Sequence, residues 1–211
     1  MGYGHPVPNC PHPRGVPMST AAAPVRPGLV LADLLPASRV RDITLVVGGA
    51  ALTGIAAQIA VPVPGSPVPV SGQTFAALLV GTALGARRGF LSLALYAVAG
   101  MAGIPWFAQA TSGYAMPSFG YILGMLLAAA VVGHFARRGA DRSVLRMAGT
   151  MAAGSAIIYA VGVPYLALAT GMSFGEAVAA GLVPFLIGDA LKAALAMGAL
   201  PTTWKLIGRR G

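Results

Sequence analysis

Long apolar runs alternate with short polar segments along most of this chain. Loops rich in Pro, Gly and Ser separate the runs, for example at 62–72, 104–117 and 171–176. A helix needs about 20 apolar residues to cross a hydrocarbon core of about 30 Å, and the second and third runs are short for that length. The pattern predicts an all-α polytopic membrane protein, with six transmembrane helices in a compact bundle over residues 39–211. The six runs are 43–61, 74–86, 89–103, 117–136, 147–170 and about 179–203.

Residues 1–38 differ in kind, because they are rich in Pro and Gly and have no apolar period. Such a composition is typical of a disordered tail. His5, Cys10 and His12 lie close together in this tail, and all three are metal-ligand types. We expect no metal site there, since such residues often gather by chance in a Pro-rich stretch. Cys10 is the only cysteine, so the chain can form no internal disulfide.

The composition excludes an ordinary soluble domain. Only 9% of the 211 residues are charged, against about 25% in soluble domains, and 56% are hydrophobic. The net charge of +9 would suit a nucleic-acid-binding protein if the basic residues followed one face. Instead they form short clusters between the apolar runs, as they do in the cytoplasmic loops of membrane proteins. We therefore expect the lipid bilayer, and no nucleic acid, as a partner.

The basic clusters fall in every second connection between runs. The connections 62–73, 104–116 and 171–178 contain no Lys or Arg. Six crossings with both termini in the cytoplasm satisfy the positive-inside rule without exception. If the second and third runs formed a re-entrant hairpin, the chain would cross four times in the same orientation; we favour six. The basic residues flanking the runs are Arg39, Arg41, Arg87, Arg88, Arg137, Arg138, Arg142, Arg146, Lys205, Arg209 and Arg210.

Two full charges, Asp189 and Lys192, lie inside the sixth run. Their three-residue spacing places them on one face of a helix. Asp189 precedes Lys205 by 16 residues and so lies about 24 Å from the inner interface. Each charge costs about 3 kcal/mol at the centre of an inserted helix, so the pair should face the bundle interior or a water-filled cavity. A structural ion pair or a polar substrate site open to the outside would explain it.

The stretch PFLIGDALKAALA at 184–196 resembles a signature of the BioY family. This family comprises the biotin-specific substrate-binding (S) subunits of energy-coupling-factor (ECF) transporters. The resemblance extends to the VP, QT and LGxxRG elements within 56–108, and to the segments 119–133 and 162–181, in the family's order. It covers residues 43–200 and leaves out the tail at 1–38.

The resemblance implies a six-helix fold in the bacterial cytoplasmic (inner) membrane that captures biotin from outside. It implies that Asp189 and Lys192 contact the ligand, and that Gln73, after the first outer loop, lies in the other ligand-facing region. Tyr114 and Phe119 stand where the family usually has smaller residues, and they are further candidate contacts. Biotin would suit the charged pair, because its ureido ring offers N–H groups to a carboxylate and a carbonyl to an ammonium.

The resemblance also implies partners, namely a membrane coupling subunit and two ATPase subunits. This chain has no G-x-x-x-x-G-K-[ST] motif and should not itself hydrolyse ATP. Small residues recur at a spacing of four in the first run, as in Gly49 with Thr53 and Ala50 with Gly54. Such a pattern lets helices approach closely, so it would either dock the coupling subunit or serve internal packing.

Other function classes remain open on the residues alone. A secondary transporter without ATPase partners, with Asp189 as a proton or ion site, is the main alternative. An intramembrane enzyme is disfavoured, because the apolar runs contain no second interior carboxylate and no histidine pair. We therefore expect no catalytic residues, no cofactor and no metal.

Overall fold

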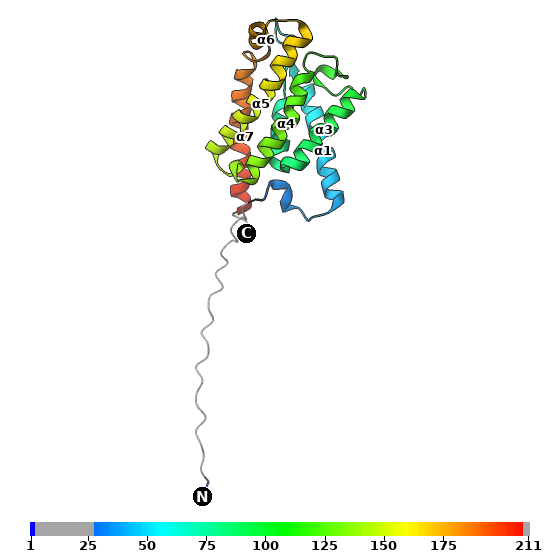
Figure 1. Ribbon diagram of the computed structural model, residues 1–211. Helices are drawn as coiled ribbons and strands as arrows, with labels where there is room; N and C mark the ends of the chain where they lie inside the picture. Colours follow the sequence, from blue (N-terminus) through cyan, green and yellow to red (C-terminus); the bar gives the residue numbers. More distant parts are fainter. Residues whose placement is uncertain (3–27, 209–211) are drawn as a thin grey trace.

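The computed structural model describes residues 1–2 and 28–208 (Figure 1). The described chain is mostly helical, and its long helices run side by side. The elements in chain order are η1 (Leu31–Leu34), α1 (Arg39–Gln58), β1 (Ala60–Val61), β2 (Val70–Ser71), α2 (Gln73–Leu84), α3 (Ala86–Met101), η2 (Ala108–Ala110), α4 (Phe119–Arg137), η3 (Ala140–Arg142), α5 (Val144–Thr170), α6 (Phe174–Gly181) and α7 (Phe185–Gly208).

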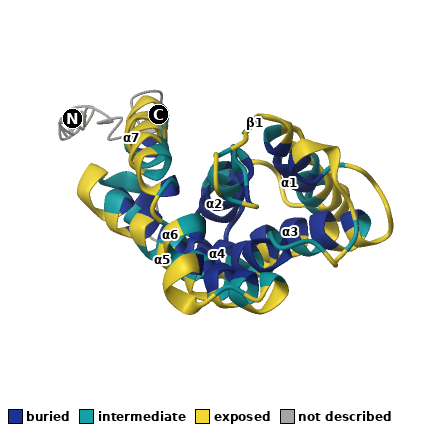
Figure 2. Ribbon diagram, turned by 90° about the horizontal axis from the view of Figure 1, so that it is seen from above, coloured by how far each residue is buried: buried dark blue, intermediate teal, exposed yellow. Residues whose placement is uncertain are grey.

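The helices α1, α3, α4, α5 and α7 follow one another along an arc, and α2 lies inside it (Figure 2). The inner helix α2 packs against α1, α3 and α4, and α4 packs along α5. Fully buried side chains gather where α2 and α4 meet, among them Leu78, Met125 and Val132. The outer helices expose large aliphatic side chains, as expected of surfaces that face lipid.

A single residue, Gly85, links α2 to α3. Its φ of +82° lies in the left-handed region, which glycine adopts without steric cost. Helix α4 crosses directly over this turn, because a Cβ on Gly133 would lie 2.4 Å from the backbone nitrogen of Ala86. Arg87 and Arg88, expected in the connection between two helices, therefore belong to the first turn of α3.

Four helices within the described residues are long and apolar enough to cross a membrane, namely α1, α4, α5 and α7. Helix α2 has 12 residues and α3 has 16, so they extend about 18 Å and about 24 Å. Both are shorter than a hydrocarbon core of about 30 Å. The predicted mostly helical membrane architecture is confirmed, whereas six crossings and the side on which the termini lie stay predictions.

The sixth apolar run is not one helix, and the expected loop at 171–178 is partly helical. Ser173 starts α6 with a capping box, in which its hydroxyl accepts from the Glu176 N–H while the Glu176 carboxylate accepts from the Ser173 N–H. Helix α6 ends at Gly181. Pro184 separates it from α7, because proline lacks an N–H donor and disfavours a helical conformation at the residue before it. The helix that carries the charged pair is thus α7 alone.

The loop between α1 and α2 departs from the all-α prediction. Residues 60–61 and 70–71 pair as a two-stranded antiparallel ribbon, with Ala60 opposite Ser71 and Val61 opposite Val70. The ribbon draws the intervening loop together beside the start of α2. The chain is therefore mostly helical with one small ribbon.

The expected disordered tail ends in an ordered turn, because residues 28–33 are buried or partly buried, whereas residues 34–38 are exposed. Val30 and Ala32 of this segment are buried. Asp33 forms ion pairs with Arg88 at 2.8 Å and with Arg137 at 3.8 Å, which tie η1 to α3 and α4. The cluster of His5, Cys10 and His12 lies outside the described residues.

The small residues of α1 face the inside of the bundle. A Cβ on Gly49 would lie 2.6 Å from Ser92 Oγ of α3, and one on Gly54 would lie 2.9 Å from the Trp106 ring. Thr53 is fully buried on the same face. These close approaches favour internal packing, and the exposed surface of α1 consists instead of large aliphatic side chains: Val40, Ile43, Val47, Leu52 and Ile55.

Candidate substrate-binding site

Helix α7 presents Asp189 and Lys192 on one face near its start. Figure 1 places this start beside α6, at the opposite end of the bundle from the first residue of α1. Lys192 Nζ lies 3.3 Å from Asp189 Oδ1, and the two side chains are 15% and 17% exposed. The predicted pairing on one helix face is therefore present, in a largely buried position.

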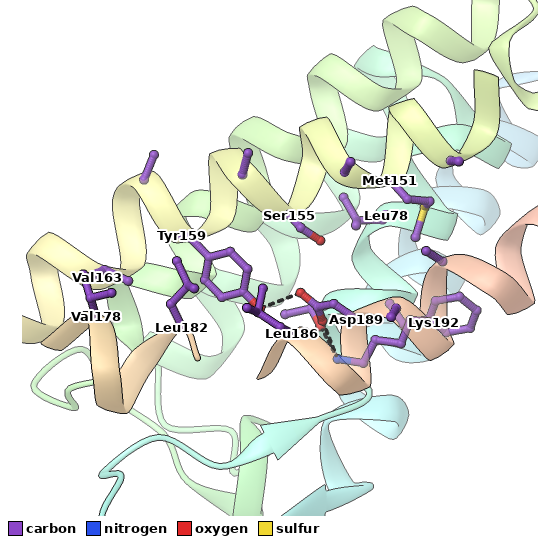
Figure 3. Close-up of a pocket in the computed structure, with 18 of the residues that line it drawn as sticks. Leu78, Met151, Ser155, Tyr159, Val163, Val178, Leu182, Leu186, Asp189 and Lys192 are labelled. Atoms are coloured by element: carbon purple, nitrogen blue, oxygen red, sulfur yellow. Dashed lines mark hydrogen bonds and ion pairs between the residues drawn. The ribbon is translucent and has the colours of Figure 1, made fainter. Parts of the chain in front are cut away.

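Two side chains from other helices complete this charged pair. The Tyr159 hydroxyl of α5 donates to Asp189 Oδ2 at 2.5 Å (Figure 3). Lys192 Nζ donates to Thr74 Oγ1 of α2 at 2.8 Å. The four side chains thus connect α2, α5 and α7. A carboxylate offers about four lone-pair positions and an ammonium about three donors, so both groups keep capacity for a ligand.

These four side chains line a cavity of about 680 Å³ between α5 and α7, with α2 and α6 at its sides. Its walls are otherwise mainly apolar, with Leu78, Met151, Val163, Leu182 and Leu186 around the polar group (Figure 3). Small-molecule sites typically have volumes of about 300–1,000 Å³ and a few polar groups that fix orientation. The cavity therefore fits a small, largely apolar molecule with one polar end.

A second, much smaller chamber of about 20 Å³ meets the cavity at the same four side chains. Residues of the β-ribbon loop, Gln73 and two aromatic rings close it. The rings of Tyr121 and Phe185 stack 6.4 Å apart, and Phe185 also meets Tyr159 edge-on at 6.5 Å. A chamber of this size holds about one water-sized group. A ring system could enter it only if the ribbon or the aromatic side chains move.

Three of the five predicted site residues come together. Gln73 begins α2 beside Thr74, is 5% exposed, and lines the small chamber with Asp189 and Lys192. Its side-chain oxygen accepts a hydrogen bond from the Tyr96 hydroxyl at 2.9 Å. This bond fixes the amide at the floor of the site.

The structure does not bring Tyr114 and Phe119 to this site, since neither lines the cavity or the chamber. Tyr114 is 68% exposed, and its carbonyl accepts from the Tyr165 hydroxyl at 3.0 Å. Phe119 is 7% exposed and packs edge-on against the same Tyr165, with ring centres 6.2 Å apart. The loop between α3 and α4 is thus anchored on α5 outside the cavity that holds the charged pair.

The residues that the sequence did not indicate are Thr74, Tyr159, Tyr121 and Phe185. Tyr159 is a polar side chain within a long apolar run, and that isolation was the one available signal. Thr74 adjoins Gln73 in the quoted QT element, whereas the two aromatic rings look like ordinary core residues in sequence.

Comparison with known proteins decides the family. The model of the BioY family matches residues 27–209. The chain belongs to the BioY family. The resemblance seen in the sequence is thereby confirmed, and the match extends further toward the N-terminus, over the segment that contains η1.

Curated members of the BioY family align along most of their length. A Pyrococcus horikoshii protein named as a probable biotin transporter BioY is 35% identical over 162 residues, which is 75% of this chain and 93% of that protein. The biotin transporter BioY of Thermotoga maritima is 34% identical over 149 residues, covering 69% of this chain and 85% of the relative.

The fold also matches a solved structure. The S-component for biotin from an ECF-type ABC transporter superposes with a TM-score of 0.72, covering 81% of this chain and 95% of the other. The two sequences are 21% identical, so this likeness establishes a shared fold. The helical bundle of this BioY-family chain is the S-component fold.

Proposed function

We propose that this protein binds biotin and takes part in its uptake, as the substrate-binding subunit of an ECF-type transporter. The observation that carries the proposal is the polar group of Asp189, Lys192, Thr74 and Tyr159 at one place in an apolar cavity. In a chain of the BioY family, such a group suits the substrate that the curated relatives' names give.

The ureido ring of biotin is complementary to the charged pair. The ureido ring carries two N–H groups, from which the Asp189 carboxylate can accept hydrogen bonds. Its one carbonyl can accept a hydrogen bond from the Lys192 ammonium. The bicyclic body and alkyl chain are apolar and suit the aliphatic walls of the cavity. A site built to bond the ureido group should strongly reject analogues without it, because its own polar groups would be left unpaired.

The membrane arrangement completes the proposal. The arginine-rich ends of the helices face the cytoplasm, and the ends that carry the ribbon, α6 and the charged pair face outward. Helices α2 and α3 cross as the second and third of six spans, tilted or extended by their loops. A membrane coupling subunit and two ATPase subunits supply the energy, and the protein resides in the bacterial cytoplasmic membrane as a multi-pass, non-catalytic component.

Labelled biotin binding to the purified protein in detergent tests the proposal, with pantothenate, riboflavin and thiamine as competitors. Biotin alone should compete. Uptake that depends on a proton gradient, without ATP, would instead support a self-sufficient secondary transporter. Equal competition by the other vitamins would overturn the assigned substrate.

Two tyrosines of α5 provide a matched pair of variants for the same assay. Tyr159→Phe removes the hydroxyl that donates to Asp189, and we expect about fivefold weaker biotin binding, equivalent to about 1 kcal/mol. Tyr165→Phe removes a hydroxyl that bonds a loop carbonyl away from the cavity, so its affinity should equal the wild type. Equal affinities of both variants would contradict a role for the polar group.

A further inference from the structure

A second large groove lies on the outer surface of the bundle, between α1 and α3. Its volume is about 710 Å³, and it is separate from the cavity beside the charged pair. Aliphatic side chains form its walls, and most of them are exposed at the surface of the described chain. The wall residues are Ile43, Val46, Val47, Leu91, Ala94, Leu95 and Val98.

One end of this groove is basic. Arg87, Arg88 and Arg137 line it there, together with Asp42. Arg88 is engaged, since it lies 2.8 Å from Asp33 and 3.1 Å from Asp42. Arg87 is exposed, and within the described part of the chain no ion pair involves it.

The balance of charge at this end is positive. Arg137 is 45% exposed, and its pair with Asp33 is long at 3.8 Å. Arg41 also belongs to the cluster through Asp42, at 2.8 Å. Three arginines therefore share the two aspartates, and with Arg87 the cluster has a net charge of +2 where the apolar groove ends.

We propose that this groove seats one anionic phospholipid, with its phosphate on Arg87 and Arg137 and an acyl chain between α1 and α3. From Arg87 to Val98 the groove follows α3 for 11 residues, which is about 16 Å. One leaflet contributes about half of a 30 Å hydrocarbon core, so the groove matches one acyl layer in length. The inference rests on the proposed membrane setting and is independent of biotin.

The basic end of the groove and its apolar walls together favour an anionic phospholipid. Guanidinium groups bind phosphate oxygens in a planar, two-bonded geometry, and basic pockets beside helices on the cytoplasmic side bind anionic headgroups. Zwitterionic lipids carry a compensating cation, which the net positive cluster disfavours. A helix of a partner subunit would fill the apolar walls but would not by itself neutralise Arg87.

Native mass spectrometry of the full chain tests the proposal, with phosphatidylglycerol and phosphatidylcholine of identical acyl chains. The wild type should retain one phosphatidylglycerol in preference to phosphatidylcholine. Arg87→Gln should weaken that retention about fivefold, as expected from loss of about 1 kcal/mol per arginine near an anionic headgroup. Arg138→Gln is the matched control, because Arg138 is exposed at the same end but does not line the groove.

A second variant separates a seated lipid from a headgroup held by charge alone. Ala94→Phe fills the apolar wall and leaves every arginine in place, so it should also reduce retention. Soluble glycerol phosphate should not compete with the lipid. Equal retention of the two lipids, or equal loss in Arg87→Gln and Arg138→Gln, would overturn the proposal. A coupling subunit in the groove would also overturn it. In that case Arg87→Gln would weaken the association of the subunits and leave lipid retention unchanged.

Discussion

Removal of the two charges of the Asp189–Lys192 pair, singly and together, separates a binding role from a structural one. Asp189→Asn keeps the size of the side chain but loses its charge and replaces one acceptor by a donor. Lys192→Met keeps the apolar stem but loses the bonds to Asp189 and Thr74, at 3.3 Å and 2.8 Å. The double variant loses both charges and leaves no unpaired ion.

The structure sets the expected magnitudes. Each side chain of the pair is about one-sixth exposed, so a single variant leaves a mostly buried charge without its counter-charge. Breaking a buried pair in this way costs about 3 kcal/mol or more of folding stability, whereas removing both partners is often neutral or stabilising. Loss of a charge-assisted bond to the ligand costs about 1.5–3 kcal/mol, which is about ten- to a hundredfold in affinity.

The assay combines thermal unfolding in detergent with labelled biotin binding. We expect each single variant to lose both stability and affinity. The double variant should unfold near the wild-type temperature and yet bind no biotin. A double variant with wild-type stability and wild-type affinity would refute the reasoning, because the pair would then be structural.

Three further perturbations test other parts of the structure. Cysteines at Ser112 and Ala140, in a background without the native cysteine, should react with an impermeant reagent in intact cells only at 112, and labelling at 140 would reverse the proposed orientation. Gly133→Ala should lower the free energy of unfolding by about 1–3 kcal/mol, because the new Cβ would meet the α2–α3 turn. The control Gly149→Ala should raise it by about 0.5–1 kcal/mol, because nothing lies within 4 Å of its Cβ. Equal effects of the two variants would disprove the close contact. Burial would raise the pKa of Asp33, but its bonds to Arg88 and Val30 and the charge of Arg137 outweigh this and hold the pKa below 3.8. The segment 28–33 should therefore resist proteolysis at neutral pH and become cleavable as the pH falls below about 4, whereas Asp33→Asn should be cleavable already at pH 7.

The sequence by itself determined the membrane class and the family. Apolar runs of spanning length and basic clusters in alternate connections are local properties, so they can be read without a fold. The pairing of Asp189 with Lys192 is local too, because a three-residue spacing puts both on one helix face. Helix α6 was missed, because its first residues were read as part of a loop and residues 179–181 as the start of the sixth apolar run.

The sequence alone could not show which side of each helix packs against the rest of the bundle. Both lipid and bundle interior are apolar, so no period distinguishes the two faces of α1. Only the packed structure shows that Gly49 and Gly54 lie against Ser92 and Trp106, while the large aliphatic residues face outward. The end of the N-terminal tail was hidden for a similar reason, because Asp33 orders it through arginines that are distant in the chain.

The full set of residues around the charged pair could also be identified only from the tertiary structure. Thr74 is 118 residues from Lys192, and Tyr159 is 30 residues from Asp189, so no local spacing joins them. Tyr114 and Phe119 were plausible contacts by position in an outer loop, yet both are drawn onto Tyr165 instead. The sequence placed two charges in a membrane helix, and the packing of α2, α5 and α7 decided which neutral side chains surround them, because contacts between distant segments depend on how the helices cross.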